Sequence, residues 1–295
     1  MKLSVFTVSM PEYTIPEAVA QVKEMGYNAI EWRVDTIGKP DWLEGDEIPF
    51  EYRYWADNKA TLDVNNIMEA ALEAKRCCDE AGIQIVSMSS SLTYQNMDLL
   101  TKVLEAASSI GCPCVRAGLF EYDPTTSDKT YPEAFEECKE GTKALYPLLK
   151  KLGVKLLFEL HHGTLNASPS SAYRMMDGLD PEYYGLIFDP GNMIFEGYEN
   201  YLKSFQLLGP YLAHVHVKNG VLEYDGEDEL GSAKWKETWT PLNKGMANLG
   251  FLIKALKQVG YTGSLSVEDF SNDCATSDKL RFNISYLKKL IAAAE

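Results

Sequence analysis

The stretch Val-Lys-Leu-Leu-Phe-Glu-Leu-His-His-Gly, residues 154–163, predicts how the chain folds. Its apolar run has the length of a β-strand and stops at Glu159, and two imidazoles and a glycine follow. The same arrangement recurs where apolar runs end at Asp189, in the segment 214–218 and at Glu268. Four apolar runs that each end in a potential metal ligand indicate strands whose ends carry the chemistry.

Strand-like and helix-like segments alternate along the whole chain. Expected strands lie at residues 3–8, 28–33, 83–88, 113–117, 154–159, 185–189, 211–217 and 263–268. Expected helices lie at residues 15–25, 64–81, 95–110, 131–152, 168–179, 198–208, 248–259 and 279–294. Such alternation requires a parallel sheet with right-handed crossovers, and eight units can close into a barrel. An open doubly wound sheet would also alternate, but no glycine-rich dinucleotide fingerprint follows the first strand. We therefore expect an α/β fold, a (β/α)8 TIM barrel that forms a single domain over residues 1–295.

Charge and composition argue against several functional classes. The chain has 28 basic and 43 acidic residues and a formal net charge of −15, which opposes binding to nucleic acid or anionic lipid. The N-terminal apolar run is too short for a membrane span and lacks the features of a signal peptide. The six cysteines show neither zinc-site spacing nor a disulfide framework. We expect a cytoplasmic protein with no nucleic-acid and no membrane partner.

The expected barrel predicts where these strand-end side chains meet. Active sites of such barrels lie where the strands end and the following loops begin, which brings Glu159, Asp189 and Glu268 together with a histidine of strand 211–217. All four histidines of the chain fall at two strand ends: they are His161, His162, His214 and His216. We expect His214 and His216 to face opposite sides of the sheet, and the pattern does not say which of them faces the site.

Three carboxylates and one imidazole form a hard, oxygen-rich set of ligands. Such a set suits a divalent ion such as Mn²⁺, Mg²⁺ or Co²⁺ and tolerates Zn²⁺, whereas a structural zinc site would use thiolates or more imidazoles. A single glutamate at a strand end is commonly solvated or salt-bridged, and a single histidine is commonly half-buried and hydrogen-bonded. Convergence from four strand ends favours a shared metal ion over four separate structural roles.

Five motifs extend over nearly the whole chain. They are Gly-Tyr-Asn-Ala-Ile-Glu-Trp-Arg at 26–33, Phe-Asp-Pro-Gly-Asn at 188–192, His-Val-His-Val-Lys at 214–218, Gly-Tyr-Thr-Gly at 260–263 and Ser-Val-Glu-Asp-Phe at 266–270. With these motifs the sequence resembles the sugar phosphate isomerase/epimerase family of xylose isomerase-like TIM barrels. That superfamily also contains ketose 3-epimerases, inositol-catabolism enzymes and zinc endonucleases of DNA repair.

The resemblance implies a set of site residues. Glu159, Asp189, His216 and Glu268 would hold one divalent metal ion, for which we expect Mn²⁺, with Mg²⁺, Co²⁺ or Zn²⁺ as alternatives. As in the ketose epimerases, Glu159 and Glu268 would also act as the catalytic acid/base pair. Three positions depart from ketose 3-epimerases and from many other relatives: Asn192 replaces a substrate-binding histidine, Asn219 replaces an aspartate and Leu222 replaces an arginine. These departures weaken the interpretation as a free-ketose 3-epimerase.

The pairing of two glutamates with a metal suits proton transfer next to a carbonyl. Such a reaction needs a base on one face of the substrate, an acid on the other and a Lewis acid for the enediolate oxygen. We therefore expect an isomerase or epimerase that depends on a divalent metal and acts on a small carbohydrate, either a sugar, a sugar phosphate or a keto-sugar. The alternative is a lyase or dehydratase that uses the same site on a keto-sugar, keto-inositol or keto-glycoside. A nuclease would need more histidine and aspartate ligands and a basic groove, which the net charge of −15 disfavours.

Several other side chains at or after strand ends are candidate substrate contacts: they are His162, Lys218, Glu31 and Trp235. For His162 and Lys218 we favour contact with substrate, whereas Glu31, like Arg33 and Arg116, also fits a structural role. Aromatic residues after the second and seventh strands suit sugar stacking or a lid, and they equally suit an interface in a homo-oligomer: they are Trp42, Tyr52, Tyr54, Trp55, Trp235 and Trp239.

Overall fold

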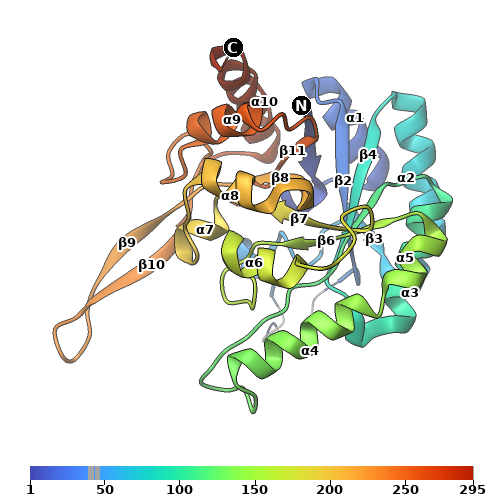
Figure 1. The fold of residues 1–295 in the computed structure, drawn as a ribbon. Helices are drawn as coiled ribbons and strands as arrows, with labels where there is room; N and C mark the ends of the chain where they lie inside the picture. Colours follow the sequence, from blue (N-terminus) through green and yellow to red (C-terminus); the bar gives the residue numbers. More distant parts are fainter. Residues whose placement is uncertain (39–42, 44–46, 295) are drawn as a thin grey trace.

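The computed structural model describes residues 1–38, 43 and 47–294, and these form a closed barrel of eight parallel strands with helices on its outside (Figure 1). In order around the barrel, the strands are β1 (Lys2–Phe6), β2 (Ala29–Asp35), β4 (Gln84–Ser90), β5 (Cys114–Arg116), β6 (Lys155–Glu159), β7 (Tyr184–Phe188), β8 (Leu212–Val217) and β11 (Ser264–Val267). Strand β1 pairs with both β11 and β2, which closes the sheet. The short strand β3 (Thr61–Asp63) pairs with the carboxyl-terminal end of β2. The predicted (β/α)8 barrel is confirmed.

Local sequence signals define the first helix, α1 (Ile15–Met25). Thr14 and Glu17 form a capping box, Pro16 lies in the first turn, and Gly26 ends the helix with a left-handed φ of 85°. The other helices are α2 (Ile67–Ala81), α3 (Met97–Ser109), α4 (Tyr131–Lys143), α5 (Tyr146–Leu152), α6 (Pro169–Met176), α7 (Asn192–Phe195), α8 (Tyr201–Leu208), α9 (Leu249–Gln258) and α10 (Thr276–Ala293). Within the described ranges, no helix has both the length and the apolar character needed to cross a bilayer.

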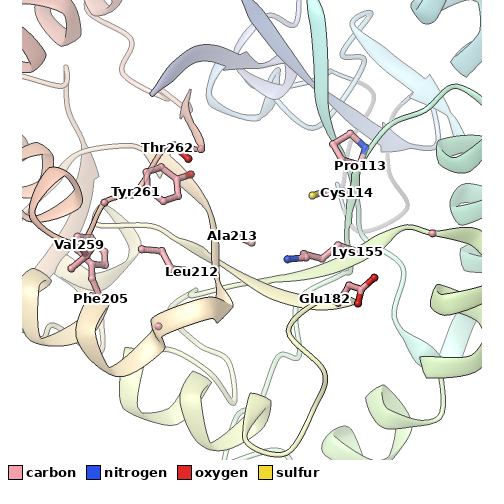
Figure 2. A pocket seen from close by; sticks show the side chains of 14 residues that line it. Pro113, Cys114, Lys155, Glu182, Phe205, Leu212, Ala213, Val259, Tyr261 and Thr262 are labelled. Atoms are coloured by element: carbon pink, nitrogen blue, oxygen red, sulfur yellow. The ribbon is translucent and has the colours of Figure 1, made fainter.

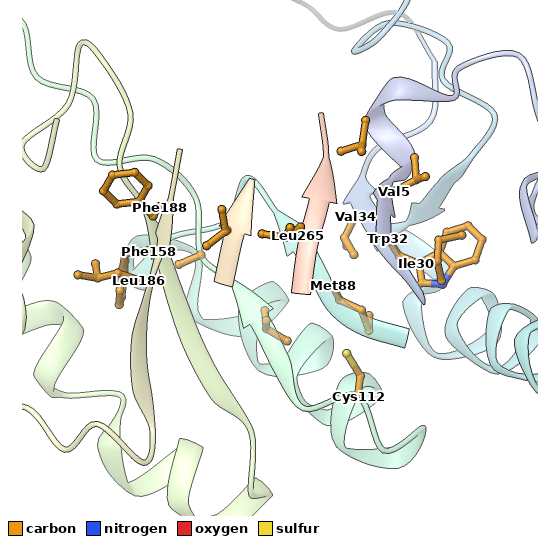
Figure 3. Packing of buried hydrophobic residues seen from close by; sticks show 14 of the residues in the cluster. Val5, Ile30, Trp32, Val34, Met88, Cys112, Phe158, Leu186, Phe188 and Leu265 are labelled. Atoms are coloured by element: carbon orange, nitrogen blue, oxygen red, sulfur yellow. The ribbon is translucent and has the colours of Figure 1, made fainter. Parts of the chain in front are cut away.

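Strand β2 shows how the barrel separates its apolar core from its polar interior. Ile30, Trp32 and Val34 are buried and belong to the main hydrophobic cluster (Figure 3). Glu31 and Arg33 alternate with them and therefore point to the opposite face of the sheet. Burial of each large apolar side chain contributes roughly 1.5–3 kcal/mol. The layer between strands and helices thus stabilises the fold, while the barrel interior is left for ionisable groups.

The predicted helix 131–152 is wrong in one respect, because the structure has two helices there. Helix α4 ends at Lys143, and α5 begins at Tyr146 with Pro147 in its first turn. Proline lacks a backbone N–H, and its ring would clash with the carbonyl of Lys143 in a continuous helix. The chain therefore turns before Pro147 and starts a new helix.

The polar segment 219–244, between the expected strand 211–217 and the expected helix 248–259, contains an antiparallel hairpin that the sequence did not predict. Strands β9 (Gly220–Glu227) and β10 (Ala233–Trp239) pair from Gly220 opposite Trp239 outward, with one register shift between Ala233 and Trp235. The hairpin extends away from the barrel (Figure 1). Most of its side chains are exposed, so it lacks the alternation of apolar and polar residues that marks a half-buried strand.

Candidate active site

Four ionisable side chains converge at the carboxyl ends of β6, β7, β8 and β11. One oxygen or nitrogen from each of Glu159, Asp189, His216 and Glu268 lies within 4.8 Å of the others. Glu159 ends its strand, Asp189 and Glu268 directly follow theirs, and His216 is the last residue but one of β8. Parallel strands present their carboxyl ends on one face of a barrel. All four side chains are buried. The structure therefore brings together the ligand set that the resemblance implies.

The cluster is arranged around one nitrogen of His216. Its Nδ1 lies 3.0 Å from Glu159 Oε1, 3.5 Å from Glu268 Oε2 and 3.7 Å from Asp189 Oδ2. Burial disfavours the charged imidazole, but the carboxylates of Glu31, Glu159 and Glu268 outweigh burial and raise the pKa of His216 well above its ordinary value. The negative charge of these carboxylates, which favours a proton on His216, would also favour binding of a divalent cation among them.

The donor set fits a divalent metal ion by its own chemistry. Three carboxylates and one imidazole are ligands that Mn²⁺, Mg²⁺ and Co²⁺ accept. Moreover, one carboxylate oxygen of Asp189, Oδ2, lies 3.0 Å from Lys218 Nζ and 3.7 Å from His216 Nδ1, so positive groups face it where a metal ion would bind. Its other oxygen accepts hydrogen bonds from the backbone N–H groups of Gly191 and Asn192, which fixes the carboxylate in place.

Glu31 lies beneath this cluster, on the inner face of β2. One of its oxygens lies 3.1 Å from His216 Nε2 and accepts a hydrogen bond from Ser89, and the other lies 2.8 Å from His214 Nε2. Glu31 is fully buried and does not line the cavity at the strand ends. We therefore no longer assign this side chain to substrate contact, because its oxygens are already engaged below the site.

Our expectation that His214 and His216 face opposite sides of the sheet was wrong. Both imidazoles contact the same carboxylate, that of Glu31, from the barrel interior. Residues two apart on a strand share a face, so the strand geometry requires this arrangement. Only His216 reaches the four-residue cluster, because it lies nearer the strand end.

Lys218 is a buried cation above the cluster. Its Nζ lies 2.5 Å from Glu268 Oε2 and 3.0 Å from Asp189 Oδ2, and the rings of Trp239 and Phe270 cover it at 4.8 and 5.3 Å. Burial disfavours the ammonium group, but the Asp189 and Glu268 carboxylates outweigh burial and raise the pKa of Lys218. A Cβ at Gly191 would lie 2.8 Å from Lys218 Cγ, so glycine is required there for the lysine to pack.

Arg116, at the end of β5, for which the sequence favoured a structural role, pairs with Glu159 and lines the cavity. Its Nη1 lies 2.5 Å from Glu159 Oε2, while Asn192 Nδ2 donates to Glu159 Oε1 at 3.1 Å. Burial favours the neutral form of Glu159, but the charges of His216 and Arg116 outweigh it and hold the pKa of this carboxyl well below its ordinary value. The feature of the sequence that linked Arg116 to the site was its place at the end of an expected strand.

Two stacked imidazoles, His161 and His162, line the same cavity. His161 Nδ1 lies 2.7 Å from the backbone carbonyl of His162, which can only accept a hydrogen bond. Nδ1 therefore carries the hydrogen, and Nε2 keeps its lone pair. His162 Nε2 lies 3.7 Å from the carboxylate of Glu237 on the hairpin.

His161 should make folding stability depend on pH. Burial lowers its pKa to about 4, so between pH 6.5 and about 4 the unfolded chain binds a proton that the folded chain does not, and stability falls as the pH falls. Replacing His161 by Asn keeps a donor for the His162 carbonyl and removes this effect, which is worth up to about 3 kcal/mol. Urea unfolding at several pH values measures it. An unchanged slope of unfolding free energy against pH in His161→Asn contradicts the assignment.

A cavity of about 1110 Å³ opens above the cluster at the carboxyl ends of the strands. Of the residues expected to contact substrate, His162 and Lys218 line it. Trp235 does not: its side chain is 60% exposed on β10, where it packs against Tyr224. Trp239, at the base of the same strand, lines the cavity instead.

The other aromatic residues expected near the site divide by position. Trp55 lines the cavity, whereas Tyr54 is buried and packs edge-to-face on Phe270. Tyr52 is exposed at the surface and does not line the cavity. Trp42 lies outside the described residues.

A second cavity, of about 660 Å³, lies at the opposite end of the barrel (Figure 2). Cys114, Lys155 and Leu212, at the amino-terminal ends of their strands, line it together with Glu182 and Tyr261. It contains no cluster of potential metal ligands within the described part of the chain. The amino-terminal face of such barrels usually serves stability, so the candidate active site lies at the other end.

Comparisons with known proteins agree with this architecture. A family model described as xylose isomerase-like TIM barrel matches residues 19–290. An inosose dehydratase of Geobacillus kaustophilus is 23% identical over 215 residues, which cover 64% of this chain and 68% of that protein. An inosose dehydratase 2 of Bacillus cereus is 30% identical over 104 residues, and this match spans 34% of this chain and 32% of the relative's length.

Solved structures show the same fold at lower identity. A 3-keto-D-glucoside 4-epimerase from E. coli in its apo form has a TM-score of 0.71 and 15% identity, with 98% of this chain and 99% of that chain covered. A xylose isomerase-like TIM barrel protein from Mycobacterium smegmatis in complex with magnesium has a TM-score of 0.69 and 16% identity, with 99% and 97% covered. Because the family model spans residues 19–290 and these barrels superpose over almost the whole chain, the protein belongs to the xylose isomerase-like TIM barrel family.

Proposed function

We propose that this protein is a divalent-metal-dependent isomerase or epimerase that moves a proton on a carbon next to the carbonyl of a carbohydrate. The observation that supports this proposal is the convergence of Glu159, Asp189, His216 and Glu268 within 4.8 Å at the base of an open cavity. These four residues would hold the ion, which when bound would supply the Lewis acid that stabilises negative charge on the substrate oxygen. Similarity to carbohydrate epimerases of the same fold agrees with this chemistry.

The two glutamates differ in their freedom to accept a proton. Both oxygens of Glu159 are engaged, by Arg116 on one side and by Asn192 and His216 on the other. Glu268 receives Lys218 on Oε2, and within the described residues its Oε1 has no hydrogen-bond partner. A carboxylate oxygen without a donor is the better base, so we assign proton abstraction to Glu268 and mainly ligand and orienting roles to Glu159.

This asymmetry also supports a second candidate, a lyase or dehydratase. An epimerase needs proton transfer on both faces of the substrate, whereas an elimination needs one base and a donor for the leaving group. Glu268 would serve as the base and the ammonium group of Lys218, which lines the cavity, as the donor. The curated relatives with inosose dehydratase names agree with this alternative.

One experiment tests the proposal and separates its two forms. The purified protein is analysed for bound metal, loaded with Mn²⁺ and incubated in D₂O with ketoses, keto-inositols and keto-glycosides. Deuterium that enters next to the carbonyl without loss of a group supports an isomerase or epimerase. Deuterium that enters with release of water or of an aglycone supports a lyase. Absence of stoichiometric metal binding overturns both.

Glu31 should govern how tightly the metal binds although it does not touch the cavity. Its carboxylate contacts His216 Nε2, which fixes the ring with Nδ1 directed at the other ligands. We expect Glu31→Gln to weaken Mn²⁺ binding about 10- to 100-fold, as measured by competition with a chelator. The matched control is Glu182→Gln, at the opposite end of the barrel. Equal metal affinities of Glu31→Gln and the wild type would reduce Glu31 to a buried structural residue.

A further inference from the structure

The arm, formed by β9 and β10 (residues 220–239), joins the barrel at Asn219, a buried asparagine. Asn219 directly follows Lys218 and directly precedes Gly220, the first residue of β9. Its side chain is buried, whereas most side chains of the arm are exposed. Because the arm extends away from the barrel (Figure 1), its position relative to the cavity depends on the contacts that hold its base.

All four hydrogen-bonding positions of the Asn219 amide are used. Its Nδ2 donates to the backbone carbonyls of Leu242 and Ala247, at 2.7 and 3.0 Å. Its Oδ1 accepts the backbone N–H groups of Gly220 and Ala247, at 3.0 and 2.8 Å. In addition, the backbone N–H of Thr240 donates to the Asn219 carbonyl. One residue therefore links the beginning of β9 to the segment that follows β10.

These contacts require an amide, which carries a donor and an acceptor at the same place. The carbonyls that face Nδ2 are able only to accept a hydrogen bond, and the N–H groups that face Oδ1 are able only to donate one. An aspartate has the same shape but no N–H, so it would place a negative oxygen against the carbonyls of Leu242 and Ala247. The amide is also tightly enclosed, since a Cβ at Gly245 would lie 2.0 Å from Asn219 Oδ1.

The base of the arm carries a ring that covers the candidate active site. Trp239 is the last residue of β10 and pairs with Gly220, the neighbour of Asn219. Its ring lies 4.8 Å from Lys218 Nζ and 4.7 Å from the ring of Phe195 on α7. Lys218 in turn contacts two carboxylates of the four-residue cluster. A displacement of the arm at its base would therefore move Trp239 relative to the groups that are to carry the chemistry.

We propose that Asn219 is a positioning residue, whose amide holds the base of the arm so that Trp239 forms the cavity wall over Lys218. Asn219 does not line the cavity, so it acts on a substrate through Trp239. The value of that wall to a substrate rests on the proposed function, whereas the attachment of the arm does not. Two substitutions disturb the amide by different routes. Asn219→Asp removes its donors, and Gly245→Ala brings a methyl group against its oxygen.

Hydrogen–deuterium exchange with mass spectrometry measures the attachment of the arm without any ligand. We expect Asn219→Asp and Gly245→Ala to speed exchange of the backbone amides of residues 240–247 about tenfold, because the hydrogen bonds that hold this segment are lost or displaced. Asn58→Asp is the matched control. Asn58 is also buried and donates to three backbone carbonyls, but these lie outside the arm and its base. This control should destabilise the protein and leave exchange at 240–247 at the wild-type rate.

The indole N–H signals in a ¹⁵N NMR spectrum report on Trp239 itself. Its signal is assigned by its absence in Trp239→Phe. We expect this signal to shift in Asn219→Asp and in Gly245→Ala, because the ring moves relative to Phe195 and Phe270, which lie 4.7 and 5.9 Å from it. The signal should keep its wild-type position in the Asn58→Asp control.

The kinetic consequence is read with whichever sugar of the D₂O panel exchanges its proton. We expect Asn219→Asp to raise KM about tenfold and to change kcat much less, because a wall contact holds substrate and transition state alike. In a Trp239→Ala background the same substitution should raise KM little further, since the residue through which Asn219 acts is already gone.

Each outcome separates the inference from the proposed function. Wild-type exchange at 240–247 with an unmoved Trp239 signal overturns the inference, whatever the activity. A KM effect of Asn219→Asp that adds in full to that of Trp239→Ala overturns it as well. If no sugar of the panel exchanges, the proposed function fails, and the exchange and NMR results alone decide the inference. If Asn219→Asp does not fold, Gly245→Ala decides it.

Discussion

Replacing Glu268 by glutamine should abolish exchange of the substrate's carbon-bound proton with solvent and leave the fold intact. Glutamine has the same shape and can still accept a hydrogen bond from Lys218, but its amide cannot take up a proton. Removal of a general base commonly costs about 10²- to 10⁴-fold in rate. NMR detection of deuterium incorporation measures the loss, and circular dichroism checks the fold.

The role of Glu268 as a metal ligand must be separated from its role as a base. Exchange is therefore measured at saturating Mn²⁺, with metal content determined in parallel. Glu159→Gln is the matched comparison, since Glu159 belongs to the same cluster but both its oxygens are engaged. We expect Glu159→Gln to lose metal affinity first. If Glu268→Gln with full metal occupancy exchanges protons at the wild-type rate, Glu268 is not the base.

Replacing His216 by alanine should remove the metal and the activity together. His216 is the imidazole around which the three carboxylates gather, and without it three negative groups are left crowded at the strand ends. We expect stoichiometric Mn²⁺ in the wild type and a large loss in the variant, measured by mass spectrometry after dialysis. The variant should also be destabilised by about 3–5 kcal/mol, because Glu31 loses one of its two buried histidine partners.

His214→Ala provides the control for that experiment. It removes the other histidine partner of Glu31, so it shares the structural cost, but its ring does not belong to the four-residue cluster. Metal loss in His216→Ala that clearly exceeds the loss in His214→Ala supports direct ligation by His216. Full metal occupancy in His216→Ala would direct the search for the ligand to His214 or His162.

The sequence predicted the barrel because the signals for strands and helices are local and strong. Apolar runs of strand length alternate with amphipathic segments, and caps such as Thr14 and Gly26 mark the helix ends. The hairpin was missed because its strands are exposed on both faces and carry no apolar period. The interruption at Pro147 was missed because the sequence alone does not show whether a proline interrupts a helix or lies in the first turn of a new one.

The site was predictable only as far as strand ends define it. Parallel strands must deliver Glu159, Asp189, His216 and Glu268 to one face, so their proximity follows from topology. The pairings within the site depend instead on how side chains from different strands meet. No local pattern shows that Glu31 engages both histidines below the cluster.

The choice between two tryptophans of one strand shows the same limit of local patterns. Trp235 and Trp239 are both aromatic and both follow the seventh barrel strand, so composition does not separate them. The hairpin base places Trp239 in the cavity wall, while Trp235 lies farther out in solvent. Distance from the barrel, which the hairpin register sets, therefore decides which of them is able to touch a ligand.

The hairpin also has a consequence for how such a barrel diversifies. Because Gly220 lies opposite Trp239 in the pairing, the arm leaves the barrel and returns to it at adjacent points. Insertions or deletions at the far tip, around residues 228–232, would change the reach of the arm without shifting the frame of the strands that carry the metal ligands. Evolution, or a designer, can thus vary length and sequence there as a separate module, while the chemistry below stays the same.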